Sequence, residues 1–221
     1  NRSDREAYDY LGIEPAKVAD AKKKKENLDI EIRDFMCKNF YDIRTFGAVM
    51  TTFVKDKLNC GQVRGPVQLD FARSVEPILA QEIGISRVTV SSEKEQEDGK
   101  HMMLGHKFIV PYGLYIAHGY ISANLARKVT GFSEEDLALL WQAIINMFEN
   151  DHSATRGSMA VRKLIVFKHE SELGNAPAYQ LFDRIKVEKN VEEKPARAYR
   201  DYTVTVDDAD LPAGVTCIQM V

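Results

Sequence analysis

Two stretches of this sequence combine glycine with arginine next to apolar runs, and they constrain both the fold and the use of the chain. The first runs from Asp42 to Gly47 and resumes from Gly61 to Gln68; the second spans His152 to Lys163 and leads into the apolar residues 164–167. Glycine lets a backbone turn tightly or approach a ligand closely, and arginine carries a fixed positive charge. Placed at the mouths of strands, such stretches are suited to hold a phosphate chain. The sequence therefore indicates binding rather than catalysis.

The length and composition predict one domain that spans residues 1–221. Of the 221 residues, 44% are hydrophobic, which is enough for one substantial core with inserted loops. No apolar run approaches the roughly 20 residues that span a bilayer. The first residues, Asn1 to Arg5, have neither an initiator methionine nor the layout of a signal peptide. We therefore expect a cytoplasmic protein with no membrane contact, and a chain that begins inside a longer protein.

Residue patterns that would indicate an enzyme or a metal site are lacking in the sequence. The three cysteines, Cys37, Cys60 and Cys217, are widely spaced and form no CxxC pair, which argues against a disulfide framework and a cysteine-built zinc site. The five histidines show neither HExxH nor HxH spacing, and neither GxxxxGK[ST] nor GxGxxG occurs. We therefore expect no catalytic residue, no metal and no cofactor.

The net charge of −3 initially argues against a nucleic-acid ligand, but the charges are unevenly distributed. Residues 153–167 contain Arg156, Arg162 and Lys163 and no acidic residue, and residues 57–69 contain Lys57 and Arg64 and again no acid. Acidic residues concentrate in 93–98, 134–136 and 188–210. Because the local field decides where a phosphate backbone can bind, the two basic stretches remain candidates.

The apolar periodicity predicts an α+β protein with two clear helices. Residues at helical spacing between Leu28 and Phe40 predict a helix over about 29–40. A second helix begins after Ser133, with Asp136 three residues later as in a capping box. Its predicted buried face comprises Leu137, Leu140, Trp141, Ile144, Ile145 and Phe148. The lysine run 22–25 is interpreted as a solvated helix face, with a phosphate contact as the alternative.

Five segments are predicted to form strands. The first follows Gly65 and Pro66, where Val67, Leu69 and Phe71 alternate with polar or small residues. The others are 86–91, 106–122 with interruptions near Pro111 and Gly113, 164–167 and 202–206. The polar segment 91–105 is predicted to be a protruding loop insertion, and 188–194 a charged connector.

The candidate binding residues also admit purely structural interpretations. Gly157 would cap a helix that ends near Asn150, with Arg156 beside the negative end of its dipole. Arg162 and Lys163 would point in opposite directions if both belonged to a strand, so that only one would face a groove. Tyr112, Tyr115 and Phe46 are interpreted as core aromatics, with base stacking as the alternative.

Several long strings resemble one protein family, the Cas-seven backbone subunit of type I CRISPR Cascade complexes, in its Csd-type form of subtype I-C. The resemblance covers roughly residues 39–187. It is carried by the strings at 39–50, 61–68, 71–74, 111–115, 156–169 and 174–177.

The resemblance implies an RRM-like (ferredoxin-like) palm, several copies of which line up along one crRNA. In that family each palm grips the sugar-phosphate backbone of the guide, while a thumb displaces a base at regular intervals. The partners implied are crRNA, target DNA through the guide, further copies of the chain and other Cascade subunits. The segment 91–105 would be a finger-like loop. This chain lacks the family's Asn-Pro-Asn-Gly-Asp-type motif, so we expect a palm without its N-terminal strand.

The resemblance and the two basic stretches together select the candidate RNA-binding residues. Ten side chains are expected to contact phosphate or ribose, and three glycines to allow close backbone approach. The side chains are Arg44, Arg64, Gln68, Arg73, Arg87, His106, Lys107, Arg156, Arg162 and Lys163, and the glycines are Gly47, Gly65 and Gly157.

Two other functions are left open by the sequence. A stand-alone RRM-like protein that binds single-stranded RNA would carry sheet-face aromatics at RNP spacing, and no RNP motif is present. A metal-dependent RNA endonuclease would use an aspartate on a loop, for which Asp42 and Asp70 are the candidates.

Overall fold

The computed structural model describes residues 2–14, 27–50, 60–87, 103–154, 156–191 and 193–221. Its helices are α1 (Arg2–Leu11), α3 (Leu28–Asn39), α4 (Tyr41–Phe46), α6 (Ala123–Leu125), the π-helix η3 (Ala126–Thr130), α7 (Glu134–Asn146), α8 (Ala178–Phe182) and the 3-10 helix η4 (Tyr199–Asp201). The first eight strands are β1 (Gly47–Val49), β2 (Gln62–Arg64), β3 (Val67–Leu69), β4 (Arg73–Ser74), β5 (Gln81–Arg87), β6 (Met103–Ile109), β7 (Tyr115–Ile116) and β8 (Gly119–Ile121). The last four are β9 (Ile165–His169), β10 (Ile185–Lys189), β11 (Tyr202–Val206) and β12 (Val215–Gln219).

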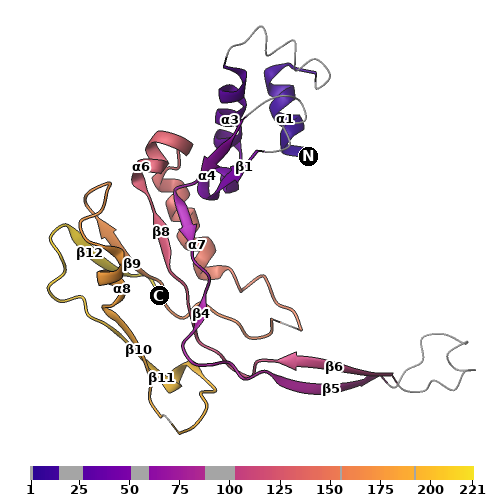
Figure 1. The fold of residues 1–221 in the computed structure, drawn as a ribbon, viewed down its shortest axis with the longest axis vertical. Coiled ribbons are helices and arrows are strands. Elements are labelled where there is room, and N and C mark those ends of the chain that lie inside the picture. The colour runs from indigo at the N-terminus through magenta and orange to yellow at the C-terminus, as the bar shows by residue number, and fades with distance from the viewer. Residues whose placement is uncertain (1, 15–26, 51–59, 88–102, 155, 192) are drawn as a thin grey trace, which may run out of the picture.

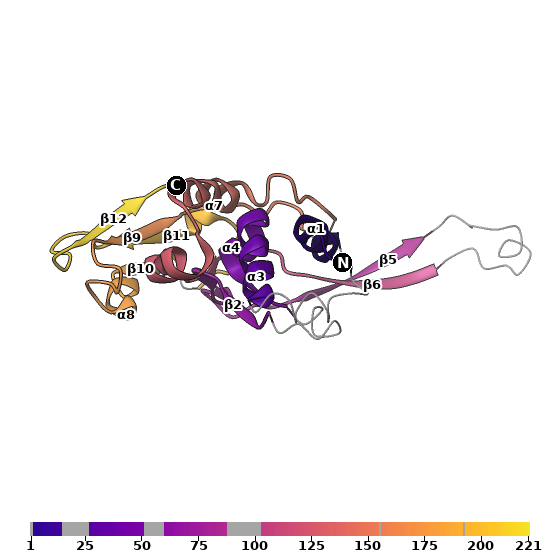
Figure 2. The ribbon, with the colours of Figure 1, turned by 90° about the horizontal axis from the view of Figure 1, so that it is seen from above.

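The described strands pair two by two, always antiparallel: β1 with β2, β3 with β8, β4 with β7, β5 with β6, β9 with β12 and β10 with β11. Figure 1 shows the helices α1, α3 and α4 at one end of the molecule, next to β1. From there β3 and β8 run toward the middle of the molecule. The β5–β6 hairpin projects to one side, and the pairs β9–β12 and β10–β11 lie on the other (Figures 1 and 2).

The helical end has its own core, to which α3 contributes more buried residues than any other described element. Leu28, Ile32 and Met36 recur every four residues, so they share one face of the helix, and all three are buried. They pack with Ala7 and Tyr8 of α1 and with residues of β1 and β2. The helix predicted over 29–40 is thereby confirmed. No prediction covered α1, whose sequence is largely charged and offers few apolar residues.

A second, smaller core joins β3 to α7. Val67, Ala126, Phe132 and Leu140 are buried there. The capping box at Ser133 is present as predicted, because the Ser133 hydroxyl accepts from Asp136 N and the Asp136 carboxylate accepts from Ser133 N. The predicted apolar face of this helix is only partly covered: Leu140 is buried, whereas the other five residues of the face are half-buried.

The strand predictions hold where local sequence decides them. Segment 106–122 is broken as expected, into the end of β6 and the short strands β7 and β8, and β11 has the predicted bounds 202–206. The alternating strand 67–71 is only partly correct, because β3 ends at Leu69. Val67 is 1% exposed, but Leu69 is 58% and Phe71 96% exposed, since no described element packs over them.

Four other segment predictions need correction or lie outside the described residues. The predicted loop insertion 91–105 extends too far, because residues 103–105 belong to β6. Its other residues, 91–102, lie outside the described part. Of the predicted strand 86–91, residues 86 and 87 belong to β5, which begins earlier, at Gln81. The predicted connector 188–194 begins inside β10, and the lysine run 22–25 is outside the described residues.

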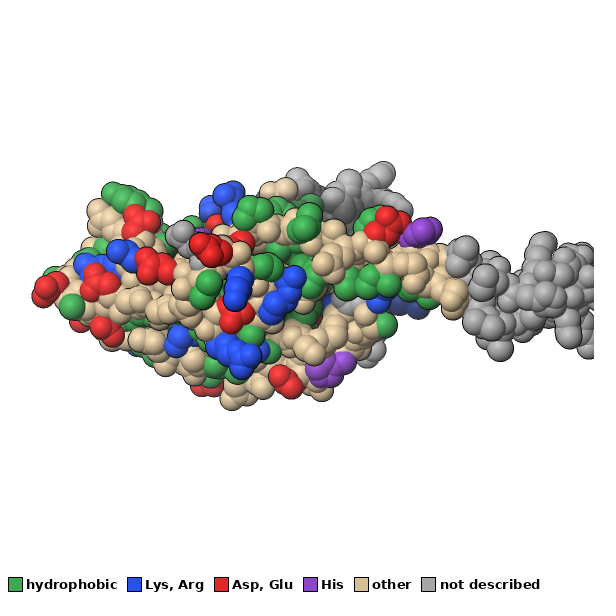
Figure 3. All heavy atoms as spheres, turned by 90° about the horizontal axis from the view of Figure 1, so that it is seen from below, with side chains coloured by type: hydrophobic (Ala, Val, Ile, Leu, Met, Phe, Trp, Pro, Cys, Tyr) green, Lys and Arg blue, Asp and Glu red, His purple; other side chains and the backbone are tan. Residues whose placement is uncertain are grey.

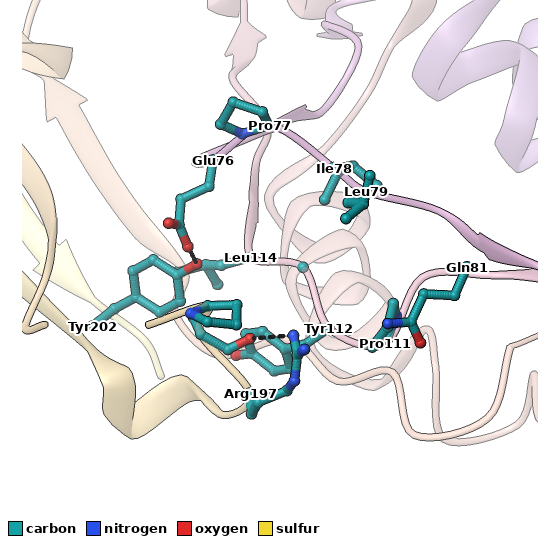
Figure 4. A pocket seen from close by; sticks show the side chains of 13 residues that line it. Glu76, Pro77, Ile78, Leu79, Gln81, Pro111, Tyr112, Leu114, Arg197 and Tyr202 are labelled. Carbon is teal, nitrogen blue, oxygen red and sulfur yellow. Dashed lines mark hydrogen bonds between the residues drawn. The ribbon is translucent and has the colours of Figure 1, made fainter. Parts of the chain in front are cut away.

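The projecting β5–β6 hairpin is anchored at its root by one carboxylate. Glu76 accepts a hydrogen bond from Lys189 Nζ at 2.7 Å and another from the Tyr202 hydroxyl at 2.5 Å. The bond from Lys189 is the main cause that lowers the pKa of Glu76, and burial, followed by the contact with Glu76, raises the pKa of Tyr202. Beside this contact lies a small cavity of about 160 Å³, lined by residues such as Leu79 and Tyr112 (Figure 4). The hairpin is thus fixed to the β10–β11 pair.

Two glycines let the backbone cross itself where the helical end meets the strands. Gly47 begins β1 with a φ of 83°, a region that disfavours other residues. A Cβ atom on Gly65 would lie 2.2 Å from the carbonyl carbon of Phe46 and 2.4 Å from Gly47 N. The two glycines are therefore needed for the approach of one backbone segment to another.

We expect Gly65→Ala to destabilise the protein, because the added methyl group overlaps with backbone atoms that cannot rotate away. The free energy of unfolding should fall by about 2 kcal/mol or more, measured by urea denaturation. Gly157→Ala is the matched control, since a Cβ there meets no atom within 4 Å. If Gly65→Ala and Gly157→Ala had the same free energy of unfolding, the close approach of the two backbone segments at Gly65 would be contradicted.

Candidate nucleic-acid interface

Arg44, the first of the predicted phosphate contacts, is committed to contacts inside the protein. Its Nε lies 2.8 Å from Asp136 Oδ2 and its Nη2 2.7 Å from Asp136 Oδ1, a bidentate pair. Its Nη1 donates to the carbonyls of Cys37 and Lys38, each at 3.0 Å. Both partners are shielded from water, with exposed side-chain fractions of 18% and 13%. Arg44 therefore joins the end of α3 to the start of α7.

The Arg44–Asp136 pair shifts the pKa of both partners in the direction expected for an ion pair. Hydrogen bonding by Arg44 is the main cause that holds the pKa of Asp136 below its usual value, and the same bonds raise the pKa of Arg44. Tyr41 adds a bond from its hydroxyl to the carbonyl oxygen of Asp136, at 2.9 Å. The sequence signalled Asp136 only as a capping residue, and its role as the partner of Arg44 was missed.

The other predicted residues of the first stretch lie at the surface. Arg64 ends β2 and Arg73 begins β4, and both side chains are exposed. Within the described part of the chain neither has a hydrogen-bond or ion-pair partner. Gln68, on β3, donates from Nε2 to the carbonyl of Gly65 at 3.2 Å. The two arginines therefore keep their donors available.

The second stretch follows α7 as a segment of turns and loop. Because α7 ends at Asn146, Gly157 lies well beyond its end, and the alternative that it caps this helix is wrong. Arg156 Nη2 lies 3.2 Å from Asp151 Oδ1, and the guanidinium of Arg162 lies 5.5 Å from the centre of the Tyr199 ring.

Lys163 lies at the end of the second stretch. It is exposed and has no partner among the described residues. Strand β9 begins only at Ile165, so Arg162 and Lys163 are not held to the alternating directions of a strand. Both side chains are exposed, and both can face the same ligand.

The hairpin carries the remaining predicted residues. His106 and Lys107 lie on β6, and Arg87 ends β5, although its side chain is outside the described residues. His106 Nδ1 lies 2.8 Å from Glu82 Oε1 on the paired strand. Lys107 Nζ donates to the carbonyl of Ala154 at 2.8 Å. Lys107 thus ties the hairpin to the second glycine-arginine stretch.

The aromatic residues divide between core and surface. Tyr112 stacks on Tyr202 with 6.4 Å between the ring centres, as expected for a packed aromatic. Tyr115 is 50% and Phe46 45% exposed, so both present part of a ring to the outside. Figure 3 shows hydrophobic and basic side chains next to one another, with acidic side chains among them, across the middle of the face seen from below. A surface of this kind suits a polyanion that also carries flat apolar bases.

The described residues show neither a cluster of metal-ligand side chains nor a membrane-spanning helix. These residues contain no group of three or more His, Cys, Asp or Glu side chains placed to hold a metal ion. Asp42 and Asp70, the candidates for an endonuclease, are both exposed. None of the helices in the described ranges has the length and apolar character needed to cross a membrane.

Comparison with known proteins identifies the family. The chain matches the family model described as CRISPR-associated protein Cas7 over residues 1–207, and it belongs to this family. No curated protein matches the chain. Membership implies a backbone subunit of a CRISPR effector complex, with roles in antiviral defence and RNA binding, and members of the family are in general not catalytic.

We expect Asp136→Asn to lower the free energy of unfolding at pH 7 by about 2–4 kcal/mol, because Arg44 would lose its charged partner in a shielded site. The pKa of Asp136 is lowered in the folded state, so its contribution is present above about pH 4 and is lost as the pH falls through the lowered pKa. The difference between variant and wild type, measured by urea denaturation, should therefore shrink as the solution becomes acidic. Asp208→Asn removes an exposed carboxylate and serves as the control. A difference that stays constant with pH would rule out this role for Asp136.

Proposed function

We propose that this chain is a backbone subunit of a type I-C CRISPR Cascade complex, of the Csd type, and that copies of it assemble along one crRNA. Family membership supports the general role, and the sequence strings at 39–50, 61–68 and 156–169 support the subtype. The structural observation that carries the proposal is the set of exposed cations Arg64, Arg73 and Lys163, which have no partner among the described residues. Such cations are suited to neutralise backbone phosphates.

The guide RNA is proposed to bind through phosphate contacts of two kinds. Arg64, Arg73 and Lys163 would contact phosphates directly. Arg156 and Arg162 would first exchange their present contacts; for Arg156 this costs little, because its ion pair with Asp151 is about half exposed. His106 can exchange Glu82 in the same way, since this pair is also exposed.

Some predicted site residues are proposed to act indirectly. Arg44 would position the first stretch and leave phosphate binding to its neighbours, because four of its donor contacts are made inside the protein. Gly47 and Gly65 approach each other, so their role would be to shape the wall beside Arg64. Gly157 has open space around it and would allow the RNA backbone to approach the protein backbone closely.

The ferredoxin-like palm is likewise a proposal. Each described pair of strands leaves unpaired edges, with which further strands of the proposed palm would pair. Further copies of the chain and other Cascade subunits would cover exposed apolar side chains such as Phe71, Leu79 and Leu173, which are 80% or more exposed. Target DNA would then pair with the bases of the guide, in the cytoplasm.

We expect the double variant Arg64→Gln/Lys163→Gln to bind single-stranded RNA less tightly and with a weaker salt dependence. If each side chain neutralises one phosphate, the slope of log K against log salt should fall by roughly 1.4 for the pair, measured by fluorescence anisotropy. Lys168→Gln/Lys186→Gln, which removes two exposed lysines from β9 and β10, is the matched control. Affinity and slope equal to those of the control would reject these contacts.

Co-expression of the protein with a CRISPR array should yield an oligomer that purifies with RNA of guide length. The expected result is a particle many times heavier than the 25.0 kDa chain, measured by light scattering. An array with scrambled repeats is the control and should yield no such particle. A nucleic-acid-free monomer in both preparations would count against the proposed assembly.

A further inference from the structure

A basic hollow lies on the helical end of the molecule, and none of the three cations Arg64, Arg73 and Lys163 lines it. It has a volume of about 630 Å³ and lies between the second half of α3, Arg44 of α4 and the π-helix η3. Five of its lining side chains are cationic: Arg33, Lys38, Arg44, Arg127 and Lys128. Apart from Arg44, the sequence analysis singled out none of them.

The charge of the hollow is unbalanced. Only two acidic side chains line it, Asp34 and Asp136, and Asp136 is already paired with Arg44. Arg127 is paired with Glu172, which lies outside the hollow. Lys38 and Lys128 are exposed, and their side-chain ammonium groups have no partner in the described ranges. The hollow therefore presents a surplus of positive charge to any ligand.

Two buried polar atoms in the wall of the hollow have unmet hydrogen-bonding capacity. Thr130 is 5% exposed, and its hydroxyl has no partner among the described residues. Arg33 Nε is buried and makes no hydrogen bond, although it lies 3.6 Å from Asp34 Oδ1. A buried polar group without a partner costs about 1–3 kcal/mol, so each such group calls for an explanation. Thr130 also ends a π-helix, a distortion that is frequent at functional sites.

The lining indicates which chemistry would bind. No aromatic side chain lines the hollow, so it offers no surface on which a base could stack. Lysine and arginine donors are suited to phosphate oxygens, and the volume exceeds what a single phosphate fills. The chemistry therefore fits the phosphodiester backbone of a nucleic-acid strand, bound without regard to sequence.

We propose that this hollow is a second nucleic-acid backbone site, built from other residues than the proposed direct guide contacts and centred on Lys38 and Lys128. Its strand contributes phosphates, and its bases point away from the protein. The proposal rests on the positive charge of the hollow and on the two buried polar atoms without a hydrogen-bond partner. It does not depend on the assignment to subtype I-C. The strand is a segment of RNA or a strand of DNA, which share this chemistry.

The test is a binding titration of the whole chain with Lys38→Gln/Lys128→Gln. The probes are labelled oligo(U), oligo(dT) and a duplex DNA of the same length, with anisotropy measured between about 50 and 200 mM salt. We expect affinity to fall several-fold at the lowest salt. The slope of log K against log salt should fall by roughly 1.4 for a single strand or roughly 1.8 for the duplex. The probe with the largest loss identifies the strand.

A charge-matched control variant distinguishes loss of this site from a general loss of positive charge. Lys168→Gln/Lys186→Gln removes the same charge elsewhere and should leave binding close to wild type. Lys38 and Lys128 are exposed, so their replacement leaves no buried charge unpaired, and thermal unfolding should match wild type. The proposal is overturned if all three probes bind the Lys38/Lys128 variant with the affinity and slope of this control.

The same titrations separate this site from the proposed guide contacts. If only the guide contacts are wrong, Arg64→Gln/Lys163→Gln binds oligo(U) normally while Lys38→Gln/Lys128→Gln still loses affinity. If only the second site is wrong, the two results are reversed.

Discussion

The bidentate pair of Arg44 and Asp136 is the interaction on which the rest of the structure depends. It joins the end of α3 to the first turn of α7, and these helices belong to two different cores. Tyr41, one turn before Arg44, packs against the second core and donates to the backbone of Asp136. One arginine therefore positions the helical end relative to the strands, and the basic hollow forms around the same side chain.

The backbone crossing at Gly47 and Gly65 lies directly after this pair in the chain. Arg44 fixes α4, and the crossing brings β1 beside β2, with Gly47 opposite Arg64 in the register. Since the backbone segments approach closely there, the Arg64 side chain is directed to the outside. The glycines would thus contribute to the proposed binding surface through packing, and not by contact with a ligand.

The sequence predicted those elements whose signals are local. The face of α3, the Ser133 capping box and the breaks at Pro111 and Gly113 each depend on residues within a few positions of one another. The partner of Arg44 could not be predicted, because Asp136 lies 92 positions away. The exposure of Leu69 and Phe71 also escaped prediction, since alternation shows that a face is apolar but not what covers it. Likewise the sequence placed positive charge in both stretches, but only the structure distinguishes Arg64 and Lys163 from the occupied Arg44.

The Glu76 contacts define the place where the β5–β6 hairpin is attached to the rest of the protein. Both hydrogen bonds at its root, from Lys189 and Tyr202, end on one carboxylate, and farther along β6 Lys107 holds the loop that contains Ala154. A force applied to the hairpin would first strain these hydrogen bonds. A displacement of the hairpin by a neighbouring molecule would therefore be transmitted in two directions, to the β10–β11 pair and to the second glycine-arginine stretch. In an assembly of repeated subunits, this would mechanically link the place where one copy is contacted to the place where it holds phosphate.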